Sequence, residues 1–183
     1  PKIKAQNCDN VKLVDIKLSR LKNMGNPITM DRFDRQILAR LQADGRISNQ
    51  ELADAIGLSP SPCLRRVRAL EEAGVIAGYR ALVDAKALGL TLMALIHISM
   101  DQHTPERFSA FEGAVAGIPE VMECLLITGQ SADYQLKVVV RDMDAYQELL
   151  LNRITRIAGV TGVHSSFVLR RVVDKTALPV GAD

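Results

Sequence analysis

Residues 51–67, with the sequence ELADAIGLSPSPCLRRV, contain the pattern that decides the fold of the first half of the chain. Ser48 stands three residues before Glu51, which is the spacing of a capping box at the start of a helix. Gly57 follows the apolar face of that helix, at the place where a left-handed residue is needed for a sharp turn. The segment 59–62, Ser-Pro-Ser-Pro, then offers two starts for a further helix.

The flanking residues complete a three-helix pattern. An earlier helix, which Gly45 ends, is predicted by apolar residues at helical spacing, namely Phe33, Ile37, Leu38 and Leu41. The helix after Gly57 is expected to bury Leu64, Val67 and Leu70 and to end at Gly74. Three short helices with a tight glycine turn between the last two predict a helix-turn-helix. Residues 75–84 alternate loosely and suggest a short hairpin or wing, and residues 86–89 a linker.

The second half has the alternation of β-strands. Strands are predicted at residues 92–100, 121–128, 134–141 and 163–172, with helices that begin near Thr104 and Asp142. The order βαββαβ predicts a four-stranded antiparallel sheet with both helices on one face, a ferredoxin-like fold. The fold class is therefore α+β. The other face of the sheet is left open, and a second copy of the chain is its simplest partner.

Composition narrows the class of protein. Hydrophobic residues make up 48% of the 183 residues and charged residues 24%, which excludes a disordered chain. No apolar run approaches the roughly 20 residues that span a bilayer. The three cysteines are far apart, which argues against a disulfide framework or zinc site and favours the reducing cytoplasm. Aromatic residues make up only 4% of the chain, and there is no tryptophan. This argues against a protein that recognises single-stranded RNA by stacking its bases on aromatic rings.

Basic charge is concentrated at the start of the chain. Residues 1–29 hold six of the 23 basic residues but only two of the 21 acidic ones. We interpret this segment as an upstream extension or an expression leader in preference to a DNA-binding arm. Because the rest of the chain is slightly acidic, any interaction with nucleic acid must depend on a local basic patch.

The motifs together resemble the leucine-responsive/asparagine-responsive (Lrp/AsnC) transcriptional regulators. The similarity is carried by residues 51–67 and by four further segments, 84–90, 117–121, 128–134 and 175–179, and it extends over residues 30–180. The resemblance implies a DNA-binding domain joined to a RAM domain, which binds an amino-acid effector. It also implies homodimers that assemble further, often to octamers, and no other cofactor. One departure is that three residues, not two, separate Gly129 from Asp133.

On this basis the chain is divided into five parts. They are an extension (1–29), the (winged) helix-turn-helix DNA-binding domain (30–80), a linker (81–90), the RAM domain for effector binding and oligomerisation (91–173) and a C-terminal tail (174–183).

The second helix of the helix-turn-helix carries the strongest chemical signal. The predicted DNA-binding residues are Ser59, Ser61, Arg65, Arg66 and Arg68. Hydroxyls at a helix N-terminus suit phosphate, and arginine suits the edges of guanine. We expect base contacts from Arg65 and Arg66, with Arg68 near the DNA backbone or near Glu71 or Glu72. The plainer alternative is a solvated charged face.

The predicted effector-binding residues, Gly129, Asp133 and Tyr134, follow from the family resemblance. Backbone groups near Gly129 and the Asp133 carboxylate would hold the charged ends of an amino acid. For Asp133, an ordinary turn-forming role is an equally good interpretation. The Tyr134 ring has the alternative of packing in the core.

The sequence contains no catalytic or metal-binding motif. His97, His103 and His164 lack metal-ligand spacing and are interpreted as structural. Cys63 is expected to be a small core residue. The prediction is thus a cytoplasmic, sequence-specific transcriptional regulator, not an enzyme, whose assembly and affinity for double-stranded DNA respond to an amino acid. The alternative is a small-molecule-binding oligomer whose helical domain serves assembly only.

Overall fold

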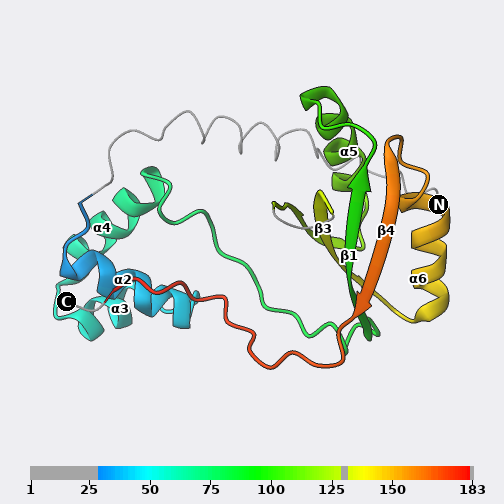
Figure 1. Ribbon diagram of the computed structural model, residues 1–183. Helices are drawn as coiled ribbons and strands as arrows, with labels where there is room; N and C mark the ends of the chain where they lie inside the picture. The colour runs from blue at the N-terminus through cyan, green and yellow to red at the C-terminus, as the bar shows by residue number, and fades with distance from the viewer. Residues whose placement is uncertain (1–28, 129–131, 182–183) are drawn as a thin grey trace, which may run out of the picture. The chain divides into compact units, whose positions relative to one another are not determined.

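The computed structural model describes residues 29–128 and 132–181, and these form two compact units (Figure 1). The helical unit consists of residues 29–81 together with 175–181. Its helices are α2 (Arg32–Ala43), α3 (Asn49–Ile56) and α4 (Pro60–Glu72). The sheet unit consists of residues 82–174.

Side-chain caps fix the starts of the first two helices. The Ser48 hydroxyl accepts from the Glu51 amide at 3.2 Å, and the Glu51 carboxylate accepts from the Ser48 amide at 2.9 Å, which confirms the predicted capping box. Asp31 and Asp34 form a second capping box at α2. Gly57 ends α3 at φ 72°, in the left-handed region, as its position predicts.

The core of the helical unit receives residues from all three helices. They are Ile37, Leu38, Leu52, Ala53, Ile56, Cys63 and Leu70. The prediction for Leu64 is wrong, because this side chain is 38% exposed and Cys63 is fully buried in its place. With α4 starting at Pro60, Cys63, Val67 and Leu70 follow one another at four and three residues along one face, and Leu64 lies beside that face.

The C-terminal segment completes the helical unit. The side-chain amide of Gln42 donates to the Leu178 carbonyl at 3.1 Å, and its oxygen accepts from the Leu178 amide at 2.6 Å. Val180 packs against the helical core. Residues 175–181, drawn in red, therefore run along α2 (Figure 1).

The sheet unit has the predicted order of strands and helices. Its elements are β1 (Leu92–Met100), α5 (Pro105–Ala116), β2 (Val121–Leu126), β3 (Tyr134–Val140), α6 (Met143–Leu149), a π turn η1 (Leu150–Ile154) and β4 (Val160–Phe167). The strands form one antiparallel sheet in the order β2-β3-β1-β4, the ferredoxin-like arrangement. Thr104 and Asp142 cap α5 and α6 with their side chains.

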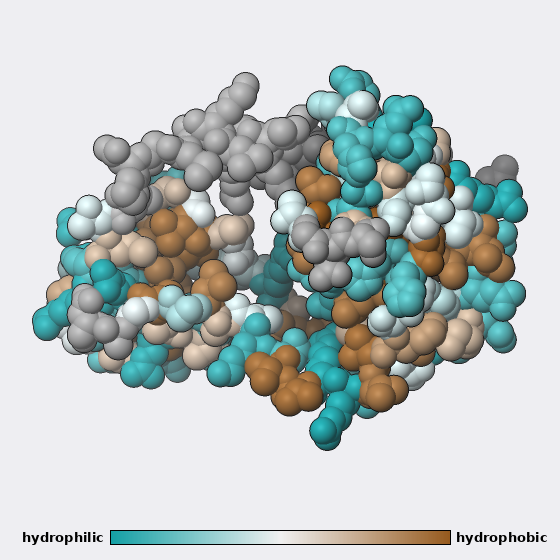
Figure 2. Space-filling view, viewed as in Figure 1, coloured by the Kyte–Doolittle hydropathy of each residue, from teal (hydrophilic) through white to brown (hydrophobic). Residues whose placement is uncertain are grey.

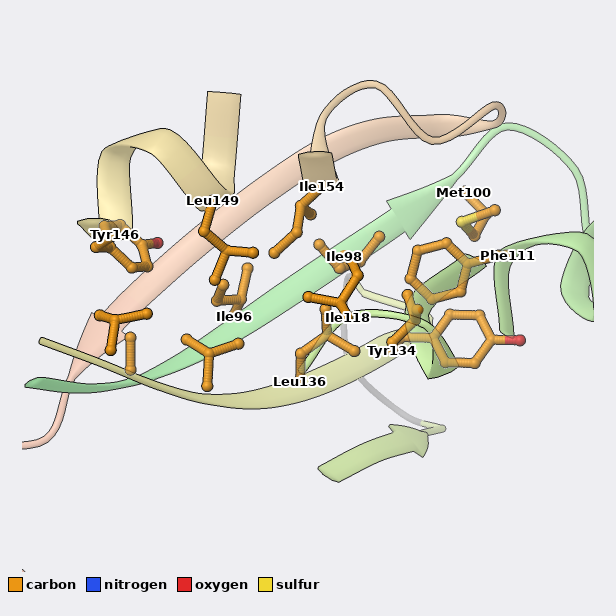
Figure 3. Close-up of a cluster of buried hydrophobic side chains, with 14 residues drawn as sticks. Ile96, Ile98, Met100, Phe111, Ile118, Tyr134, Leu136, Tyr146, Leu149 and Ile154 are labelled. Carbon is orange, nitrogen blue, oxygen red and sulfur yellow. The ribbon is translucent and has the colours of Figure 1, made fainter. Parts of the chain in front are cut away.

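One face of the sheet forms the core with α5 and α6. Ile96 and Ile98 of β1, Leu136 of β3 and Phe111 of α5 are fully buried there, and Figure 3 shows them in one continuous cluster. The opposite face holds the alternate residues, among them Leu95, which lies in register with Lys137 and Ser166. Neither helix covers this open face, so the alternation in the sequence is realised as two chemically different surfaces.

Several predicted strand boundaries differ from the structure, because β2 ends at Leu126, not at residue 128, and β4 begins at Val160, not at residue 163. The last strand ends at Phe167, not at residue 172, and residues 168–174, all described, contain no strand. Residues 75–84, which are also all described, contain none either. The apolar residues that suggested strand at both places are instead exposed, as in Leu82, Leu169 and Val172.

Hydrophobic residues reach the surface of both units, where they lie among polar ones (Figure 2). Among the described residues, none of the helices has both the length and the apolar character that crossing a bilayer requires.

Candidate nucleic-acid interface and effector site

The exposed face of α4 presents hydroxyl and guanidinium groups in one line. Ser61, Arg65 and Arg68 are all exposed and follow one another at four and three residues, so they share one side of the helix. Neither arginine forms an ion pair with another described residue. We call Ser61, Arg65 and Arg68 the α4 stripe. Both of its guanidinium groups can bind an anionic or hydrogen-bonding partner.

Ser59 lies at the start of the same helix. It is the N-cap residue of α4, and its hydroxyl makes no capping hydrogen bond with the helix. Pro60 follows at the first helical position, where the missing N–H costs nothing. The exposed Ser59 hydroxyl is therefore available beside the helix N-terminus, which favours an anion such as phosphate.

Arg66 is held away from the α4 stripe. Its Nη1 lies 2.8 Å from Asp34 Oδ1 and 2.9 Å from Asp31 Oδ2, at the N-terminus of α2. Its guanidinium also lies 5.4 Å from the centre of the Phe33 ring. The hydrogen bond to Asp34 raises the pKa of Arg66 further, so its charge is permanent. These contacts tie α4 to α2, and the structure does not bring Arg66 together with Arg65 and Arg68.

The Asp31 carboxylate serves both the helix cap and the arginine. Its Oδ1 accepts from the Asp34 amide at 3.0 Å, and its Oδ2 pairs with Arg66. The hydrogen bond from the Asp34 amide, followed by the contact with Arg66, lowers the pKa of Asp31. The capping box and the ion pair therefore stabilise the same charged form of this side chain.

Asp133 is fixed by backbone and side-chain hydrogen bonds. Its Oδ2 accepts from the Met100 amide at 2.7 Å, and its Oδ1 lies 2.6 Å from His103 Nε2. Its own amide donates to the Ile98 carbonyl at 2.8 Å, and its carbonyl accepts from the Ile127 amide at 2.9 Å. Asp133 thus joins the end of β1 to the start of β3. Only 19% of its side chain is exposed.

Tyr134 is a core residue with a polar tip. Its ring is buried beside Phe111, with the ring centres 4.6 Å apart (Figure 3), and its hydroxyl donates to Glu112 Oε1 at 2.8 Å. Burial and the Glu112 carboxylate raise the pKa of Tyr134, so the hydroxyl keeps its proton. Tyr134 follows Asp133 directly in the chain, but its ring packs in the core. Gly129 lies outside the described residues.

Two family models match most of the described chain. One, described as winged helix-turn-helix DNA-binding, matches residues 30–77, and the other, the Lrp/AsnC ligand binding domain, matches residues 93–178. The chain belongs to the Lrp/AsnC family of transcriptional regulators. This confirms the family, the fold class and the pairing of a DNA-binding domain with a ligand-binding domain that the sequence predicts.

Curated relatives are similar to this chain over nearly their whole length. The Bkd operon transcriptional regulator of Pseudomonas aeruginosa is 42% identical over 151 residues, which cover 82% of this chain and 98% of that protein. The leucine-responsive regulatory protein of Escherichia coli K12 is also 42% identical over 151 residues, with 82% and 92% covered.

Solved structures of similar proteins share the fold. The regulator NMB0573 of Neisseria meningitidis, solved as a complex with L-Met, has a TM-score of 0.79 and 38% identity, and the match covers 83% of this chain and 97% of that one. AsnC of E. coli has a TM-score of 0.74 and 30% identity, with 80% and 97% covered.

The two cysteines in the described part of this Lrp/AsnC chain are fully or partly buried. Cys63 is fully buried in the helical core, and burial raises the pKa of its thiol. Burial and Glu112 raise the pKa of Cys124 to about 11. Both groups are therefore thiols at neutral pH, the less reactive form. Cys8 lies outside the described residues.

The histidines are placed at two different sites. His97 and His164 are register partners on β1 and β4, and their side chains lie on the open face of the sheet. In the described part of the chain, no three His, Cys, Asp or Glu side chains come together as metal ligands. His103 instead pairs with Asp133, thirty residues away. Sequence reasoning missed this pair and the Tyr134–Glu112 pair, because neither contact leaves a periodic signal.

Proposed function

We propose that this Lrp/AsnC chain is a sequence-specific regulator whose assembly and affinity for double-stranded DNA respond to an amino acid, and that it is not an enzyme. Residues 30–80 would bind DNA, and residues 91–173 would bind the effector and join subunits. Residues 81–90 would link them. Its work on DNA would place it in the cytoplasm.

The observation that carries the DNA-binding proposal is the α4 stripe. Arg65 and Arg68 are exposed on one side of the helix that follows the glycine turn, and both lack an ion-pair partner among the described residues. A helix of this kind fits the major groove, where arginine makes bidentate hydrogen bonds to guanine. We assign base contact to Arg65, and phosphate contact to Ser59, Ser61 and Arg68.

Arg66 has a different proposed role. Its ion pairs with Asp31 and Asp34 already use the guanidinium. Arg66 would therefore act on DNA through the placement of α4. The double substitution of Arg65 and Arg66 would remove one direct contact with DNA and the ion pairs that hold α4 against α2.

For the effector we propose an L-amino acid at the turn that contains Gly129 and Asp133. The related N. meningitidis regulator was solved as a complex with L-Met, and the curated relatives include leucine-responsive proteins. L-methionine and L-leucine are therefore the first compounds to test. The Asp133 carboxylate would attract the ammonium group, and Tyr134 would support Asp133 from the core.

Regulation would work by linkage. An effector that binds one assembly state more tightly shifts the population toward that state, and DNA affinity changes if the states present the α4 helices differently. The open face of the sheet supports a homodimer, and we propose further assembly to an octamer.

The DNA-binding proposal is tested by measuring duplex affinity against salt concentration. Arg65→Ala should cost about 1–3 kcal/mol of specific affinity. Arg170→Ala, which removes an exposed arginine of the sheet unit, is the matched control and should leave affinity unchanged. Equal effects of the two substitutions, or no duplex binding by the wild type, would favour an oligomer whose helical domain serves assembly only.

A further inference from the structure

Both oxygens of the Asp133 carboxylate already have partners. Oδ2 is held by the Met100 amide, and Oδ1 by His103 Nε2 at 2.6 Å. The Met100 bond involves backbone at the end of β1, so it is fixed by the sheet. The His103 bond involves a side chain of the loop between β1 and α5. A ligand that binds Asp133 through Oδ1 must therefore displace the His103 side chain.

The His103 side chain has few contacts that hold it beside Asp133. Its side chain is 67% exposed, against 19% for Asp133. Besides Asp133, its described contact is an edge-on approach to the Phe108 ring, with the ring centres 6.0 Å apart. Moving His103 into solvent therefore breaks one hydrogen bond and uncovers little apolar surface.

We propose that His103 competes with the ammonium group of the effector for the Asp133 carboxylate, and so sets the effector concentration at which the protein responds. This inference rests on the proposed effector role of Asp133. His103 offers a ring N–H to the carboxylate, as the ammonium group of the effector would. The effector must therefore displace His103 from Oδ1, and this lowers the apparent affinity of the protein for the effector.

The other charged groups nearby are already paired or turned to solvent. Asp101 of the loop pairs with Arg107 of α5 at 3.1 Å, and Glu112 of α5 accepts from the Tyr134 hydroxyl. Glu106 is exposed in the first turn of α5. Asp133 is therefore the acidic group with which His103 pairs.

The test is calorimetric titration of the full chain with L-methionine and L-leucine. His103→Ala should bind the amino acid about two- to tenfold more tightly than wild type, because the effector no longer has to displace His103 from Asp133. His103→Gln, which can keep a neutral hydrogen bond to Asp133, should fall between the two. Gln102→Ala, in the same exposed loop, is the control and should match wild type.

Asp133→Asn separates this inference from the proposed function, because the amide oxygen can still accept from Met100. If Asp133→Asn weakens binding while His103→Ala leaves it unchanged or weaker, the competition is overturned and the proposed site stands. If Asp133→Asn binds as wild type does, the pocket lies elsewhere and both fail. Failure of wild type to bind either amino acid also overturns both. Melting curves of each variant identify any loss of folding.

Discussion

Arg65 and Arg66 are neighbours in the sequence, but different contacts hold them. Arg65 is exposed, whereas Arg66 joins Asp31 and Asp34 at distances of 2.9 and 2.8 Å. Arg66→Ala should therefore lower the free energy of unfolding by about 1 kcal/mol, and Arg65→Ala should change it by less than about 0.5 kcal/mol. Urea unfolding of the two variants checks this. Equal losses would remove the structural role of Arg66.

The residue scale also shows what sequence could and could not predict. The exposed positions of Ser61, Arg65 and Arg68 follow from helical spacing alone. The ion pairs of Arg66 do not, because Asp34 is 32 residues away and nothing in a single sequence links the two. His103 and Asp133 are similarly separated. Short-range periodicity therefore predicts the face of α4 but not the partners of its side chains.

At the scale of elements, local chemistry determines where helix α3 begins and ends. The Ser48–Glu51 capping box and Gly57 are predictable because each depends on residues within one turn. The exposure of Leu64 is not, because the buried side of α4 depends on how the helix packs against α2 and α3, which helical spacing alone does not show. The end of β4 depends on the neighbouring strand β1. Because β1 begins at Leu92, the antiparallel register leaves residues beyond 169 without a partner on β1. Those residues therefore form no strand, although their sequence alternates as a strand does.

The docking of the C-terminal tail yields an element-scale prediction. Gln42 makes two hydrogen bonds with the Leu178 backbone, from α2 to residues 175–181. Gln42→Ala should lower the free energy of unfolding of the helical unit by about 1–3 kcal/mol, since each of the two bonds contributes about 0.5–1.5 kcal/mol. Gln36→Ala, an exposed position on the same helix, is the matched control. Identical urea midpoints would show that the tail contributes nothing.

At the scale of the whole molecule, the open face of the sheet should join two copies. Leu95 lies on this face, in register with Lys137 and Ser166. Leu95→Glu would bury a charge between subunits, so it should shift the full chain to monomer at micromolar concentration. Sedimentation velocity measures this shift. Leu151→Glu, at an exposed position after α6, should keep the wild-type assembly, and an unchanged Leu95→Glu assembly would contradict a sheet-to-sheet dimer.

The central claim, that an amino acid controls binding to specific DNA, is tested most directly by one anisotropy titration. Duplexes selected by the protein from a random pool would be titrated at about 150 mM salt, alone and with each standard L-amino acid. The account predicts that the selected duplex binds more tightly than random duplex, and that at least one amino acid changes this affinity by about 5- to 150-fold. Equal affinity for selected and random duplex, or no effect of any amino acid, would contradict it.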